Sequence, residues 1–175
     1  MTNLPEPKFT GVLTLSASSV IDAPIEKVWD VLCNFQSYSE WNDFVHAQVI
    51  VDGKTKKPLP DQTAREGTYL LMDVHIPPSP DASRPPTSRP LEIITAVDHT
   101  NYRVAWVNCM PKWLVNAERW QALSVVEGGK TLYETREVMG GIGAYFIKWF
   151  MFASLTKGFQ AVADGLKKRA EQLQQ

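Results

Sequence analysis

The sequence has 175 residues, of which 44% are hydrophobic and 21% charged, and its formal net charge is −1. A chain of this length buries about 70% of the surface that it exposes when unfolded, so we expect residues 1–175 to form one domain with a hydrophobic core. The balanced charge argues against nucleic-acid binding, which needs a basic face, and it gives no overall field that would gather anionic lipid.

The N-terminus, the hydropathy and the cysteines together predict a cytoplasmic protein. Residues 1–8 contain two prolines and lack the basic region and apolar run of a secretory signal. The most apolar stretch, residues 143–155, is too short to span a bilayer and is interrupted by Lys148, so no stable membrane insertion is expected. Cys33 and Cys109 are far apart and have no metal-binding spacing, which favours two reduced thiols.

The chain is predicted to begin with a strand followed by two short helices. Alternating apolar side chains predict the strand at residues 13–21. Asp22 then precedes Pro24, and an acidic cap with proline in the first turn is typical of a helix start. Apolar residues recur at intervals of three and four up to Phe35, which indicates an amphipathic helix. Residues 37–44 predict a second helical turn.

Six further strands are predicted, at residues 44–51, 68–76, 91–97, 102–108, 114–126 and 131–139. In the second of these, Met72 shares a face with Leu70 and Val74, because side chains alternate along a strand. Short turns join the last four strands, and the pair Gly128-Gly129 favours a hairpin. Strands that are neighbours in the sequence should therefore pair antiparallel.

Residues 76–90 hold six prolines and predict a stiff loop, since proline has no N–H to join a strand ladder. Long loops of this kind often form the lids or rims of binding sites.

The last predicted element is a helix over residues 143–174. Its second half carries an apolar stripe opposite charged residues. Its first half, from Tyr145 to Phe152, is apolar on nearly every side. We therefore expect this half either to be buried on all sides by the protein or to contact a molecule other than protein. Seven antiparallel strands with this helix define an α+β architecture. Such a sheet curls, and one helix cannot fill its concave face, so an internal ligand cavity is expected.

The segment SSVIDAPIEKVWDVLCNFQSYSEWNDFV resembles the N-terminal signature of the SRPBCC superfamily, which includes START, pollen-allergen-like, polyketide cyclase/dehydrase and lipid-transport proteins. The matching positions are Ala23, Pro24, Val28, Trp29, Leu32, Trp41 and Asn42. The resemblance covers residues 12–173 and implies a helix-grip fold, in which a seven-stranded curved sheet wraps around a long C-terminal helix. It implies function only weakly, because one fold hosts many activities. Asp43 replaces the proline of the usual W-N-P and puts a carboxylate either at the pocket mouth or simply on the surface.

The facing of two strands decides which charges enter the cavity. Periodicity leaves both faces open, whereas the resemblance places Arg119 and Glu137 inward, as neighbours. One interpretation is a buried ion pair that fixes the two strands. The other makes them catalytic, with Arg119 holding a carbonyl or enolate oxygen and Glu137 acting as general base. Burial would raise the pKa of Glu137 and Arg119 would lower it, which leaves the outcome open.

Further candidates for contact with the ligand are large aromatic, flexible apolar or amide side chains: Trp41, Met72, Trp106, Asn108, Gln121, Tyr133, Tyr145, Trp149 and Phe152. For the aromatic residues the alternative is core packing, and for the polar ones it is satisfaction of backbone groups. The three histidines lack metal-ligand spacing and no glycine-rich phosphate loop occurs, so neither a metal nor a cofactor is expected.

Three functions remain open. The first is a cofactor-free cyclase, isomerase or dehydratase that acts on a polyketide- or terpenoid-like substrate. The second is a non-catalytic carrier for a lipid, quinone or similar hydrophobic molecule. The third is a protein-interaction module, which would leave Trp113, Phe146 or Phe150 exposed. In the first two the partner is a hydrophobic small molecule, and the chain is expected to be a monomer or a homodimer.

Overall fold

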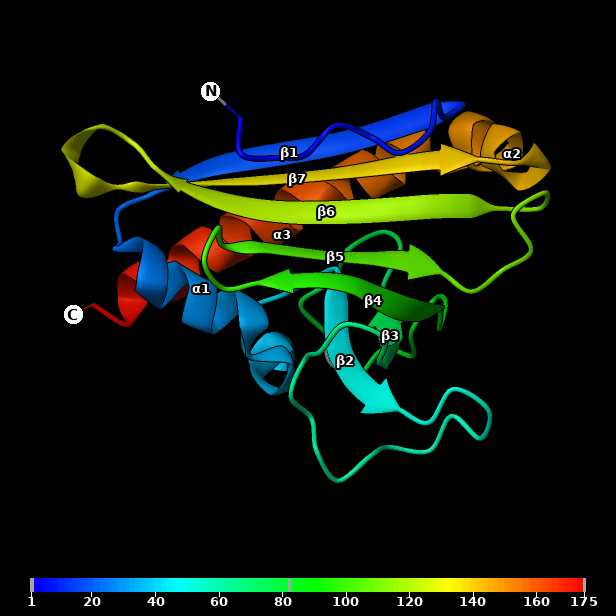
Figure 1. Ribbon diagram of the computed structural model, residues 1–175, viewed down its shortest axis with the longest axis horizontal. Coiled ribbons are helices and arrows are strands. Elements are labelled where there is room, and N and C mark those ends of the chain that lie inside the picture. Colours follow the sequence, from blue (N-terminus) through cyan, green and yellow to red (C-terminus); the bar gives the residue numbers. More distant parts are fainter. Residues whose placement is uncertain (1, 82, 175) are drawn as a thin grey trace.

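A computed structural model describes residues 2–81 and 83–174 and shows an α+β helix-grip fold (Figure 1). A seven-stranded antiparallel sheet has the order β1-β7-β6-β5-β4-β3-β2. The elements are β1 (Leu13–Ile21), α1 (Ile25–Cys33), the 3-10 helix η1 (Phe35–Glu40), β2 (Val45–Val51), β3 (Tyr69–Val74), β4 (Leu91–Asp98), β5 (Arg103–Asn108), β6 (Asn116–Val125), the 3-10 turn η2 (Glu127–Gly129), β7 (Thr131–Gly140), α2 (Ile142–Phe150) and α3 (Phe152–Gln172). The sheet curls around α3, so that β2 runs at a steep angle to β6 and β7 (Figure 1).

The two short helices after β1 follow from local sequence. Pro24 sits at the N-cap of α1 with φ −60°, where its missing N–H costs nothing. The apolar positions of α1 then turn inward and are buried. The second helical turn begins earlier than predicted, at Phe35, and is a 3-10 helix. The Tyr38 hydroxyl holds it against α1 by donating a hydrogen bond to the Leu32 carbonyl, at 2.7 Å.

The β6–β7 hairpin sets the register of the inward-facing charges. Gly128 and Gly129 have φ of 77° and 72°, which L side chains rarely adopt, and so allow the tight connection. The resulting register puts Arg119 directly opposite Glu137. The predicted facing of both strands is confirmed, because Arg119, Tyr133 and their same-face neighbours lie on the concave side.

The predicted final helix is two helices, broken at Met151, which has φ −120° and ψ −9°. Hydrogen bonds continue across the break, from Met151 N–H to the Ile147 carbonyl and from Leu155 N–H to the Met151 carbonyl, both at 2.9 Å. The break allows α3 to lie along the concave face while α2 remains at the end of β1 and β7 (Figure 1).

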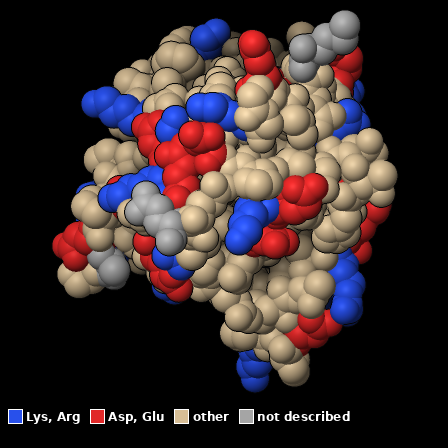
Figure 2. Space-filling view, turned by 90° about the vertical axis from the view of Figure 1, so that its left-hand side faces the viewer, with Lys and Arg blue, Asp and Glu red and all other residues tan. Residues whose placement is uncertain are grey.

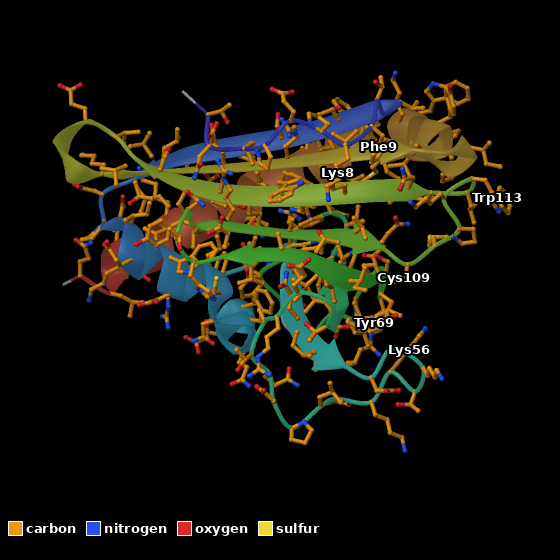
Figure 3. The ribbon with its side chains drawn as sticks, in the orientation of Figure 1. Lys8, Phe9, Lys56, Tyr69, Cys109 and Trp113 are labelled. Carbon is orange, nitrogen blue, oxygen red and sulfur yellow. The ribbon has the colours of Figure 1, made fainter. Side chains whose placement is uncertain are left out.

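The N-terminal segment covers part of the convex face, where Lys8 and Phe9 lie over the sheet (Figure 3). It buries Glu118, whose carboxylate accepts a hydrogen bond from Trp120 Nε1 at 3.0 Å and forms an ion pair with Lys8 Nζ at 3.2 Å. Among the described residues, no helix has both the length and the apolar character needed to cross a bilayer.

Glycines in α3 allow it to approach the elements that precede β2. A Cβ at Gly158 would lie 2.4 Å from the ring of Phe44, and one at Gly165 would lie 2.3 Å from the Trp41 carbonyl oxygen. Backbone cannot give way as an aromatic side chain can, so Gly165 fixes the distance between α3 and the end of η1.

We expect Gly165→Ala to lower the free energy of unfolding by about 1–3 kcal/mol, because overpacking against backbone outweighs the helix propensity that alanine gains. Chemical denaturation measures the change. Lys157→Ala, on the exposed side of the same helix, is the control and should leave stability nearly unchanged. Equal effects of the two substitutions would contradict the close approach.

Candidate functional site

A cavity of about 440 Å³ lies between the concave face of the sheet and α3. Its wall is mostly apolar, and its largest apolar side chains are Phe44, Met72, Trp106, Met139, Leu155 and Phe159. Exposed members of the lining, among them Ser88, Arg89 and Met110, mark the side on which it opens. The volume and the lining are typical of a pocket for a small hydrophobic molecule.

Arg119 extends from β6 into this cavity and is 6% exposed. Its Nε donates a hydrogen bond to Thr135 Oγ1 at 3.2 Å, and that hydroxyl donates in turn to the Trp120 carbonyl at 3.1 Å. The guanidinium carbon lies 4.1 Å from the ring centroid of Phe159 and 5.9 Å from that of Trp106. Aromatic faces therefore provide part of the stabilisation that water gives an exposed guanidinium.

Glu137 lines the same cavity but does not pair with Arg119. Among the described residues, no salt bridge joins Arg119 to a carboxylate, so the interpretation of a buried ion pair between the two strands is wrong. Burial raises the pKa of Glu137 above its ordinary value, and the positive charge of Arg119 offsets only part of that rise. The carboxyl group consequently holds its proton more tightly than a carboxyl in water.

A second carboxyl group, that of Glu92 on β4, also lines the cavity. Burial raises its pKa well above the ordinary value, the negative charge of Glu137 raises it further, and Arg119 opposes both. Glu92 is not among the residues predicted from the sequence to contact a ligand. The signal was an acidic residue near the start of a mostly apolar strand, but β4 shifts register between Ile94 and Ala96, and such a bulge removes the alternation from which a face is assigned.

Three further predicted contact residues lie at the cavity wall: Met72, Trp106 and Asn108. The amide of Asn108 is already occupied, because Nδ2 donates to the Val115 carbonyl at 2.9 Å and Oδ1 accepts from Ala117 N–H at 2.8 Å. Asn108 therefore holds the connection between β5 and β6, which was the ordinary alternative considered for it.

Gln121 and Tyr133 face the concave side but do not line the cavity. Both are buried, and the Tyr133 hydroxyl donates a hydrogen bond to Gln121 Oε1. The two polar groups satisfy each other within the core, which is the alternative to ligand contact considered for polar candidates.

Four aromatic residues predicted at the cavity lie elsewhere. Trp41 is buried between η1 and α3, and Tyr145, Trp149 and Phe152 are 50%, 73% and 45% exposed. From the same part of the chain, Ile147 and Met151 line the cavity instead.

The proline-rich loop contributes to the rim through Ser88, Arg89 and Pro90, as its length suggested. Arg89 anchors it by an ion pair with Asp73, at 2.8 Å. The other end is anchored by Ser79, whose N–H donates to the Asp43 carbonyl and whose carbonyl accepts from His46 Nε2, at 2.8 and 2.7 Å.

Asp43 and His75 lie near the anchored end of this loop. Asp43 is exposed and lies outside the cavity, in agreement with a surface role. Strand alternation puts His75 on the face opposite to that of Met72, yet it is 2% exposed and stacks on His46 with 3.9 Å between ring centroids. Within the described part of the chain, no group of three or more His, Cys, Asp or Glu side chains is arranged to hold a metal ion.

Known structures with similar folds come from several bacteria. A hypothetical protein from Helicobacter pylori superposes with a TM-score of 0.74 at 11% identity, over 97% of this chain and 99% of its own. An aromatase/cyclase from a Streptomyces species gives 0.69 at 12% identity, over 93% and 96%. A START superfamily protein from Mycobacterium smegmatis gives 0.59 at 15% identity, over 91% and 98%. At these identities the likeness establishes the fold alone.

Sequence comparison gives a closer relationship. Oxopyrrolidines biosynthesis cluster protein O from Penicillium oxalicum is 26% identical, over 94% of this chain and 90% of its own length. The model of the family described as polyketide cyclase/dehydrase and lipid transport matches residues 12–171, nearly the whole chain. The predicted relationship is thereby confirmed, and the chain belongs to the polyketide cyclase/dehydrase and lipid transport family.

Proposed function

We propose that the protein is a cofactor-free cyclase, isomerase or dehydratase that acts on a hydrophobic, carbonyl-bearing substrate of polyketide or terpenoid type. The observation that carries the proposal is the arrangement of Glu92, Arg119 and Glu137 in a mostly apolar cavity. Burial of ionisable side chains is unfavourable. A fold that needed only an apolar pocket would therefore not gain from placing these three in its wall.

In the proposed first step, Arg119 binds the carbonyl oxygen of the substrate and Glu137 removes a proton from the adjacent carbon. The electron pair of the broken C–H bond becomes an enolate, whose negative charge develops on the oxygen held by Arg119. The guanidinium is positioned beforehand by Thr135 and Phe159, so little reorganisation is needed as the charge appears. The raised pKa of Glu137 makes it a stronger base than an exposed carboxylate.

In the second step, Glu92 supplies the proton that completes the reaction. Its pKa lies well above the ordinary value, so its carboxyl group carries a proton at pH values where exposed carboxyls have lost theirs. In a cyclisation, the enolate carbon attacks a second carbonyl group and Glu92 protonates the resulting alkoxide. In a dehydration, the enolate expels a neighbouring hydroxyl group, which leaves as water with the proton of Glu92.

The apolar wall also contributes to the proposed catalysis, because it fixes the conformation of the bound substrate. Trp106 and Phe159 are nearly completely buried and rigid, so they present fixed surfaces to a flexible chain. The conformer in which the reacting carbon lies near its target is rare in water, and binding in the cavity would hold the substrate in that conformer. Removal of water also protects an enolate from premature protonation.

The alternative is a carrier that binds a hydrophobic molecule without changing it. The predominantly apolar lining of the cavity favours it, as does the lipid-transport branch of the family. A carrier has no need for a proton donor and acceptor, and the two functions therefore differ in their dependence on Glu92 and Glu137.

Catalysis is tested by proton exchange on a simple apolar ketone, benzylacetone, followed by NMR in heavy water. We expect the protein to accelerate deuterium uptake next to the carbonyl group, and Arg119→Ala and Glu137→Ala each to reduce the acceleration by about 100-fold or more. Met139→Leu, which alters the lining without altering its charge, should retain most of it. Full activity in both charge variants would contradict the assignment of these residues.

The carrier is tested by native mass spectrometry of the protein as purified. A carrier is expected to retain a hydrophobic molecule, seen as a constant added mass that disappears on denaturation. A bound molecule together with failure to exchange benzylacetone would favour the carrier over the enzyme. A clean mass equal to that of the chain would count against it.

The raised pKa of Glu92 predicts how stability depends on pH. The folded protein holds this proton more tightly than the unfolded chain, so its stabilising effect is complete below the ordinary pKa of 4.5 and is lost as pH rises toward the folded value. While the group stays protonated, the loss amounts to about 1.4 kcal/mol per pH unit.

Glu92→Gln removes this dependence, so the variant should gain stability relative to the wild type as pH rises from 4.5 to neutrality. Thermal melting at both pH values measures the change. Glu66→Gln, at an exposed carboxyl, serves as the control and should track the wild type. A stability difference between Glu92→Gln and wild type that is the same at both pH values would contradict the buried, protonated Glu92.

A further inference from the structure

One end of the molecule carries an exposed aromatic face that the cavity does not explain. It is formed by α2, the first residue of α3 and the loop between β5 and β6, and its members are Trp113, Ile142, Tyr145, Phe146, Trp149, Phe150 and Phe152. These side chains are 45–73% exposed. Contiguous exposed apolar patches on soluble proteins mark interaction sites when they are large. Exposure of Trp113, Phe146 and Phe150 is the feature that was expected of an interaction module.

The loop and the helix form a single surface. Ile142 N–H donates a hydrogen bond to the Trp113 carbonyl at 3.0 Å, and Gly143 N–H donates to the Leu114 carbonyl at 2.8 Å. A Cβ at Gly141 would lie 2.7 Å from the Leu114 carbonyl oxygen, so the helix start is seated directly on the loop. Trp113 projects from the same end of the sheet (Figure 3), and the aromatic face is therefore held by backbone contacts.

The charged residues nearest in sequence to the aromatic face are basic. Between Glu137, which points into the cavity, and Asp164, the chain has no acidic residue and carries Lys148 and Lys157. In the β5–β6 loop the charged residue is Lys112, which is exposed like Lys148. The opposite end of the molecule differs, because acidic and basic side chains are intermixed there (Figure 2). A net charge of −1 thus conceals a local basic and aromatic region.

We propose that the aromatic face docks peripherally on an anionic lipid surface. Tryptophan and tyrosine favour the interface between headgroups and acyl chains, because their rings are amphipathic. Phenylalanine side chains on the same helix face enter the acyl region, while lysine ammonium groups reach anionic headgroups. A nine-residue helix with this composition can lie in the interface but cannot cross the bilayer.

A lipid surface fits this face better than a second copy of the chain. Lys148 flanks the aromatic side chains of α2, where its Nζ donates a hydrogen bond to the Val12 carbonyl at 3.3 Å, and a two-fold pair built on this patch would bring two such lysines toward each other. Lysine is also depleted in protein interfaces, where its charge must be desolvated. At a membrane the long lysine side chain extends to the headgroups and stays hydrated.

The docking face and the cavity share one helix. Ile147 and Met151, on the other side of the α2–α3 segment, line the cavity. Docking would therefore place the cavity wall next to an apolar phase, from which a poorly soluble ligand could enter without crossing water. The docking itself does not depend on the chemistry proposed above.

Co-sedimentation with vesicles tests the inference, with pure phosphatidylcholine compared with a mixture containing phosphatidylglycerol. We expect binding to the mixed vesicles that weakens as salt is added. The double substitution Trp149→Ser with Phe150→Ser should reduce it by about tenfold or more. The control is Val125→Ser with Leu173→Ser, which removes two apolar side chains that are 62% and 51% exposed outside the aromatic face. It should bind as the wild type does.

Three outcomes would overturn the proposal. The first is a wild-type protein that sediments with neither vesicle. The second is equal binding by the two double variants. The third is a concentration-dependent dimer, seen by analytical ultracentrifugation, that the Trp149/Phe150 variant abolishes while vesicles have no effect; the face would then bind protein. Both variants should keep the melting temperature and the uptake of a soluble hydrophobic dye, which separates loss of docking from loss of the cavity.

Discussion

The geometry of the whole site depends on one constraint, which is that a single helix cannot fill the concave face of a seven-stranded sheet. Helix α3 packs chiefly against β1 and α1, where Gly165 brings its backbone close to Trp41. Under β3 to β6 the concave face has no such cover, and the 440 Å³ cavity lies there. Protein interiors are otherwise close-packed, and empty apolar space lowers stability. A ligand that fills this cavity and packs against its apolar wall would therefore stabilise the protein.

Where α3 does reach the middle of the sheet, it meets the charge on which the proposed chemistry depends. Phe159 packs on the guanidinium of Arg119, and Thr135 accepts its Nε–H. Because these neutral partners hold Arg119 in place, it need not bind a carboxylate, and within residues 2–81 and 83–174 neither Glu92 nor Glu137 forms an ion pair. Both carboxyls consequently keep raised pKa values. A direct ion pair would have lowered the pKa of Glu137 and ended its use as a base.

The sequence predicted the features that local patterns determine. Strand alternation, the Gly128-Gly129 turn and the family resemblance together gave the facing of Arg119 and Glu137. Depth below the surface is not encoded in alternation, so the burial of Gln121 and Tyr133 behind the cavity could not be predicted. Glu92 lies beside a bulge that breaks the pattern. Helix α2 is apolar on almost every side, and a helix without a polar face gives no indication of which side turns inward.

The outer side of α2 is apolar although it faces away from the core. In a helix that only covers a core, residues on the outer side gain nothing from being aromatic, and exposed aromatic surface favours aggregation. The inner positions Ile147 and Met151 already complete the cavity wall. The exposed rings of Trp149 and Phe150 are therefore not required by the fold, and they belong to the same helix whose Ile147 lines the space where a hydrophobic ligand would bind. A ligand of low solubility needs an apolar source near its binding site, and a lipid surface under α2 would provide one whether the protein transforms that ligand or only carries it.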